Sequence, residues 1–87
     1  MNTMNLYHVS QNQNDGYDTY SDFVICAPDE ETARSANPNT GEPMTPADWK
    51  PPFPDWCDAP EHVTVRLIGT ATESTKPGII CASFRAG

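Results

Sequence analysis

The fold is decided by the stretch His62-Val-Thr-Val-Arg-Leu-Ile-Gly-Thr-Ala71 and by the apolar run Gly78-Ile-Ile-Cys-Ala-Ser-Phe84 that follows it. In the first stretch, Val63, Val65 and Leu67 alternate with polar residues, and an apolar period of two indicates a half-buried β-strand. The residues between the two runs are polar and include proline and glycine, which is typical of a turn. We therefore predict that the two runs pair as a β-hairpin.

Two further strands are predicted nearer the N-terminus, over Leu6–Gln11 and Ser21–Ala27. The Asn-Asp-Gly sequence between them is a strong turn signal. In the second strand Phe23 and Val24 fall on opposite faces, because side chains alternate along a strand. Both faces of that strand are therefore apolar, and we expect each to be covered.

The covers are predicted to be a short helix on one face and a long loop on the other. Asp29 is a good N-cap for the helix, and Asn37-Pro38 ends it. Residues 38–60 contain seven prolines, and we expect a long proline-rich connection that packs on the sheet. Within it, Thr45-Pro-Ala-Asp48 predicts a single capped helical turn.

The predicted order is strand, strand, helix, long loop, strand, strand. Its simplest form is an α+β fold, in which a small antiparallel sheet of about four strands carries one short helix and the proline- and tryptophan-rich loop. A chain of 87 residues is large enough for one small core, so residues 1–87 are expected to form a single domain.

The net charge of −7 is unevenly spread along the chain. Residues 1–33 contain no Lys or Arg, whereas acidic and basic residues nearly balance in the remainder. An acidic field of this kind repels nucleic acid and anionic membranes and attracts basic partners. The acidic residues of this base-free third are Asp15, Asp18, Asp22, Asp29, Glu30 and Glu31.

The chain has no run near the ~20 apolar residues that a membrane span needs. Its first residues lack the basic and apolar regions of a signal peptide, and Met4 is an alternative start. The odd number of widely spaced cysteines favours reduced thiols over a disulfide framework. Together these features predict a cytoplasmic protein.

The candidates for catalytic or metal-binding motifs are three cysteines, two histidines and the acidic turn. Zinc ligands usually occur as closely spaced pairs, but the nearest pairing here is Cys57 with His62. The acidic turn around Gly16 lacks carboxylates at the positions of a calcium loop. No signature supports a Cys–His nucleophile, and no glycine-rich phosphate loop or basic stripe is present. We therefore predict a non-enzyme without a metal or cofactor.

Two features of the sequence are typical of binding. Asp18, Tyr20 and Asp22 would share one face of a strand by the period of two, and the helix start would add Asp29, Glu30 and Glu31 to an acidic arc with Asp15. The second feature is an aromatic group in the long loop, which would either cover the sheet or anchor an interface. This group comprises Trp49, Phe53 and Trp56.

Four motifs resemble those of small uncharacterised proteins found in phages and prophages. The motifs are Tyr17-Asp-x-Tyr20-x-x-Phe-Val-Ile-x-Ala27, Glu30-Glu-x-Ala-Arg34, Leu67-Ile-Gly-x-Ala71 and Gly78-Ile-Ile-x-Ala-Ser-Phe84-x-Ala-Gly87. The resemblance covers most of the chain except the proline-rich loop. It implies a cytosolic accessory protein, and by analogy an inhibitor of a host enzyme or defence complex, as anti-CRISPR proteins are.

Composition and resemblance together predict an acidic protein that inhibits or modulates a host nucleic-acid-handling or defence protein. Its carboxylates would imitate the spacing of phosphates and occupy a basic groove of that protein, without binding nucleic acid or membrane itself. The alternative is an oligomerising or adaptor domain that binds through the Trp49–Trp56 loop. The sequence leaves the oligomeric state open.

Overall fold

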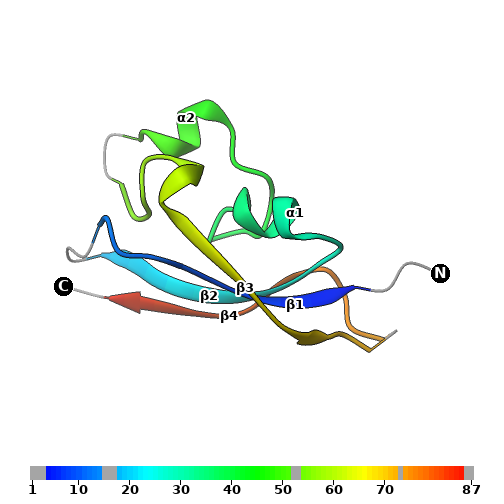
Figure 1. The fold of residues 1–87 in the computed structure, drawn as a ribbon. Coiled ribbons are helices and arrows are strands. Elements are labelled where there is room, and N and C mark those ends of the chain that lie inside the picture. Colours follow the sequence, from blue (N-terminus) through cyan, green and yellow to red (C-terminus); the bar gives the residue numbers. More distant parts are fainter. Residues whose placement is uncertain (1–3, 15–17, 52–53, 73, 86–87) are drawn as a thin grey trace.

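Four β-strands form one antiparallel sheet in the computed structural model (Figure 1), which describes residues 4–14, 18–51, 54–72 and 74–85. The strands lie in the order β3-β1-β2-β4. Two short helices accompany the sheet, so the predicted small antiparallel sheet of an α+β protein is confirmed. The strands are β1 (Asn5–Gln11), β2 (Thr19–Ala27), β3 (Val63–Thr70) and β4 (Gly78–Arg85).

The predicted hairpin between β3 and β4 is wrong, because these two strands lie at opposite edges of the sheet. β3 pairs with β1, and β4 pairs with β2. Three strand spacings, roughly 14 Å, separate the two edges. The connection from Ala71 to Pro77 can span about 23 Å when extended, so it crosses the end of the sheet without difficulty.

Register places one set of alternate side chains in the core. Tyr7 is opposite Ile25, and Val9 lies between Phe23 and Val65. Each edge strand contains one extra residue that shifts its register, Ile68 in β3 and Ile80 in β4. Both isoleucines are about half exposed, which fits side chains displaced from regular pairing.

Both helices begin at caps that the sequence predicts. Asp29 accepts a hydrogen bond from the backbone N–H of Thr32 and starts α1 (Glu30–Arg34). Thr45 and Asp48 form a reciprocal capping box at the start of α2 (Pro46–Trp49). A 3₁₀ turn, η1 (Pro60–His62), leads directly into β3. Helices this short are stable only through tertiary packing.

The described residues of the segment 28–62 form a layer on one face of the sheet, which we call the cover layer (Figure 1). The expectation that the helix and the loop cover opposite faces is therefore wrong. Ala33 and Ala36 from the helical end and Trp56 from the loop enter the same core. The buried members of that core are Tyr7, Val9, Phe23, Ile25, Ala27, Ala33, Ala36, Trp56, Cys57 and Val63.

The opposite face of the sheet, which we call the open face, has no described element over it (Figure 1). It carries the strand residues that alternate with the buried ones, and these are mixed in polarity. None of the described helices is long and apolar enough to cross a membrane. The open face presents Leu6, His8, Ser10, Asp22, Val24, Thr64, Arg66, Cys81 and Ser83.

Candidate binding surface

Negative charge is concentrated on the cover layer. This layer contains eight of the twelve acidic residues and only two of the five basic ones, whereas four acids and three bases remain for the rest of the chain. Seven of the eight side chains are exposed, and Asp55 is half-buried. We call this set the acidic surface; it comprises Asp29, Glu30, Glu31, Glu42, Asp48, Asp55, Asp58 and Glu61.

The predicted acidic arc is divided between the two faces of the sheet. Asp22 contacts His8 on the open face, whereas the three acids at the start of α1 lie in the cover layer. Tyr20 packs against the core and donates a hydrogen bond to Asn39, so it does not share a face with Asp22. The cause is a register shift in β2 between these two residues, where Ser21 is the extra residue.

Two members of the arc, Asp15 and Asp18, precede β2 in the sequence. Asp18 is exposed and has a positive φ of 58°, so it belongs to the end of the turn and not to the strand. Asp15 lies outside the described residues. The sequence arc is therefore not one surface; the acids of the cover layer come from the start of α1 and from the segment that follows it.

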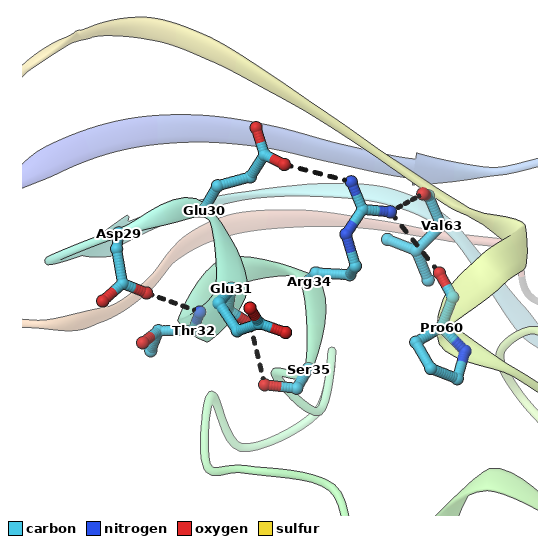
Figure 2. A network of polar contacts seen from close by, with 8 residues as sticks. All are labelled: Asp29, Glu30, Glu31, Thr32, Arg34, Ser35, Pro60 and Val63. Atoms are coloured by element: carbon cyan, nitrogen blue, oxygen red, sulfur yellow. Dashed lines mark hydrogen bonds and ion pairs between the residues drawn. The ribbon is translucent and has the colours of Figure 1, made fainter.

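The start of α1 shows how one part of the acidic surface is held (Figure 2). The hydrogen bond from the Thr32 backbone lowers the pKa of Asp29, which keeps this carboxylate charged. Glu30 accepts a hydrogen bond from Arg34 at 3.3 Å. The same guanidinium donates to the backbone carbonyls of Pro60 and Val63. Arg34 is thus directed toward β3, where it fastens the helix to the sheet.

Few of the acidic side chains have a cationic partner. Among the described residues, three ion pairs are formed, and two of them involve the acidic surface: Glu30 with Arg34, and Asp58 with His62 at 3.6 Å. The second pair is charged only when the histidine is protonated. The acidic surface therefore keeps a net negative charge at neutral pH, and it can attract a cationic surface over roughly a Debye length of 8–10 Å.

Asp22 has a different environment from these carboxylates. Its side chain lies 2.7 Å from the ring nitrogen Nε2 of His8 and accepts a hydrogen bond from Ser21. The hydrogen bond with His8 is the main cause that lowers the pKa of Asp22. A carboxylate paired in this way contributes to the β1–β2 contact and is unsuited to meet a partner's cation.

Replacing Asp22 tests how its contribution to the free energy of unfolding depends on pH. Since the pKa of Asp22 is lower in the folded protein than its ordinary value of 3.8, its stabilisation is present above that value and is lost as the pH falls through the folded pKa. Asp22→Asn should lower the free energy of unfolding by less than about 1 kcal/mol near pH 6, because the pair is partly exposed. The difference from wild type should vanish toward about pH 2 in urea titrations.

The matched control is Glu42→Gln, which removes an exposed carboxylate from the cover layer. Because Glu42 forms none of the ion pairs among the described residues, its replacement should change the free energy of unfolding near pH 6 by less than Asp22→Asn does. An Asp22→Asn deficit that persisted undiminished at acid pH would assign the effect to packing and not to charge.

The aromatic group of the long loop lies mostly in the core. Trp56 is 3 % exposed, and its ring centroid lies 5.3 Å from that of Phe23. Trp49 is partly buried against the same cluster, and Phe53 lies outside the described residues. The loop is therefore a cover for the sheet, and Trp56 is a core residue that is not free to anchor a partner.

The cysteines differ in exposure. Cys26 and Cys57 are buried, and Cys81 is exposed on β4. Burial raises the pKa of the Cys57 thiol to about 11, so this group stays protonated at neutral pH and is a poor nucleophile. Among the described residues, no three His, Cys, Asp or Glu side chains are grouped so that they could hold a metal ion.

An open pocket of about 260 Å³ lies between the β1–β2 turn and the end of the loop, and it is lined by Gln13, Asn14, Pro54, Trp56 and Asp58. Asn14 donates hydrogen bonds to the carbonyls of Pro54 and Trp56. Gln13 accepts from the backbone N–H of Asp58. Because the Trp56 ring is almost fully buried, it offers little surface to a ligand, and these contacts serve to join the turn to the cover layer.

No family model, no curated protein and no solved structure matches this chain at a significant level. The functional argument therefore depends on the residues themselves, and above all on the charge of the cover layer.

Proposed function

We propose that this protein is a non-catalytic binding protein that docks its acidic surface on a basic surface of another protein. The observation that carries the proposal is the separation of charge, with eight carboxylates and two cations in the cover layer. One of those cations, Arg34, is engaged with Glu30 and two backbone carbonyls. An approaching cationic surface thus meets an excess of negative charge.

The partner that fits best is a host protein that handles nucleic acid, including one of a defence system. Such a protein presents Lys and Arg along a groove for phosphates, and carboxylates at similar spacing compete for the same cations. Occupation of the groove would inhibit or modulate the host protein. A phage-associated origin is part of this proposal, and its support is the resemblance of the strand and helix motifs.

The alternative, an oligomerising or adaptor domain that binds through the Trp49–Trp56 loop, has less support. Trp56 is buried beside Phe23, which removes one of the two tryptophans among the expected anchors. Trp49 is half-buried on the core as well. We therefore favour the acidic surface as the site of binding.

The test neutralises carboxylates that have no cap or ion-pair role. Glu31→Gln/Glu42→Gln/Glu61→Gln removes three charges and should weaken binding to a basic host partner by about tenfold to a hundredfold, since charges at an interface rim contribute roughly 0.5–1 kcal/mol each. The measurement is titration calorimetry with nucleic-acid-binding proteins captured from bacterial lysate on the immobilised wild-type protein, with DNA as the competitor.

The matched control is Glu31→Asp/Glu42→Asp/Glu61→Asp, which keeps the charge and changes only the side-chain length. It should bind within about threefold of wild type, and binding of both should weaken as salt rises. Binding that is insensitive to salt and to the glutamine substitutions, or that DNA does not displace, would reject the proposal.

A further inference from the structure

The two edges of the sheet differ in how their free backbone groups are protected. The edge strand β3 contains Arg66, and α1 packs against β1, β2 and β3. Arg34 also donates to the carbonyl of Val63, at the start of β3 (Figure 2). Charged side chains and a covering helix are the usual means by which proteins prevent strands from adding to an edge.

The other edge strand, β4, is less protected, because α1 packs on the other three strands and the one charged residue of β4, Arg85, stands at its end. Its residues from Gly78 to Phe84 carry no charge and include two isoleucines and a phenylalanine. Ile80 is 50 % exposed and Phe84 is 47 % exposed, although Phe84 also contacts Tyr20 at a ring distance of 4.8 Å. A strand that carries no charge over seven residues, is apolar and has no described strand paired along one side is a template for another strand.

We propose that the free edge of β4 pairs with β4 of a second copy of this chain, antiparallel, about a twofold axis near Ser83. The self-complementary register of β4 about Ser83 points to a second copy as the occupant, and the distribution of acidic residues agrees with it. Two copies that met through the cover layer would bring two acidic surfaces together, whereas β4 contains no carboxylate. Pairing through β4 therefore allows two chains of charge −7 to associate with their acidic surfaces held apart.

The backbone of β4 fits this register. Ile80 is the extra residue that shifts the register of β4, so the regular part of this strand extends from Cys81 to Arg85. The carbonyl of Ser83 accepts a hydrogen bond from the Ser21 hydroxyl of β2 and thus faces into the sheet. In an antiparallel strand the inward- and outward-facing residues alternate, so the backbone groups of Ala82 and Phe84 face the free edge.

Side chains also match in this register. An axis at Ser83 places Phe84 of each copy opposite Ala82 of the other, and these two residues lie on the same face of β4. A large aromatic ring thus meets a small residue twice, and each such pair exchanges two backbone hydrogen bonds. The result is a continuous sheet of eight strands with both cover layers on one side.

Sedimentation equilibrium up to about 0.1 mM tests the association, since weak interfaces are populated at that concentration. Wild type should approach twice the 9.6 kDa mass of the chain. Ser83→Lys places two lysines at the axis and should weaken the dimer at least tenfold. The matched control is Thr64→Lys, at an exposed position of the other edge strand, and it should leave the dimer unchanged.

A cross-linking experiment tests the register without depending on the lysine variant. Cys81→Ser/Ser83→Cys places one exposed thiol of each copy at the axis, because Cys26 and Cys57 are buried. With oxidised glutathione as electron acceptor, this variant should form a disulfide-linked dimer much faster than Cys81→Ser/Thr64→Cys. A monomeric wild type, equal cross-linking of the two variants, or loss of the dimer in Thr64→Lys would overturn the proposal; the last result would indicate packing through the open face.

Discussion

Phe23→Ala is expected to remove much of the stability of this protein. Phe23 is 2 % exposed and lies in the central strand β2, where it contacts Trp56 of the cover layer. Truncation of a buried phenylalanine costs about 3–5 kcal/mol, because transfer free energy is lost and a cavity remains. A domain of 87 residues has a free energy of unfolding of only about 4–13 kcal/mol.

Urea denaturation followed by tryptophan fluorescence measures this effect, since Trp56 reports on the contact that is lost. Leu67→Ala is the matched control, because Leu67 is in edge strand β3 and is 61 % exposed. It should cost less than about 1 kcal/mol. Equal losses for the two variants would mean that the sheet does not derive its stability from the face beneath the cover layer.

Local features of the fold were predictable from the sequence because their causes are local. Alternation over Val63, Val65 and Leu67 predicts β3, and the cap at Asp29 predicts the start of α1. The capped turn at Thr45 was predictable for the same reason. Each of these signals depends on residues within a few positions of one another.

The order of the strands was not predictable by the same reasoning. Alternation indicates that a segment is a strand, but it does not name the neighbour of that strand. The seven residues between β3 and β4 have the composition of a hairpin turn. The same seven residues are also long enough to cross the end of the sheet from one edge strand to the other, which is the connection that is observed. The two faces of β2 are both apolar, and this suggested two covers, whereas only one face carries the cover layer.

The candidate site illustrates a second limit of sequence reasoning. The base-free third of the chain suggested one acidic arc, but the register shift at Ser21 separates Asp22 from Tyr20. The acids from Glu42 to Glu61 do not stand out in the sequence, because prolines and aromatic residues separate them. These acids become apparent when charges are summed over the whole segment between β2 and β3. The residues of a segment that crosses one face of a sheet lie on that face, so their charges belong to one layer.

Two substitutions of Trp56 should have very different effects. Trp56→Ala deletes the indole that holds the end of the loop against Phe23, and it should cost about 3–5 kcal/mol. It should also expose residues 38–60 to proteolysis before the sheet unfolds, because the cover layer loses the largest of its side chains that are buried in the core. Trp56→Phe keeps an aromatic ring at the same place and is the matched comparison.

The indole nitrogen Nε1 of Trp56 is buried and has no hydrogen-bond partner among the described residues. An unsatisfied buried donor costs roughly 1–3 kcal/mol, and Trp56→Phe removes that cost while it leaves a smaller cavity. These two terms oppose each other, so the free energy of unfolding should change by no more than about 1 kcal/mol. Trp49 remains in both variants as the fluorescent probe for urea denaturation. If Trp56→Phe were as destabilising as Trp56→Ala, the indole N–H would have to make a stabilising hydrogen bond in solution, and the cover layer would be held by a polar contact as well as by packing.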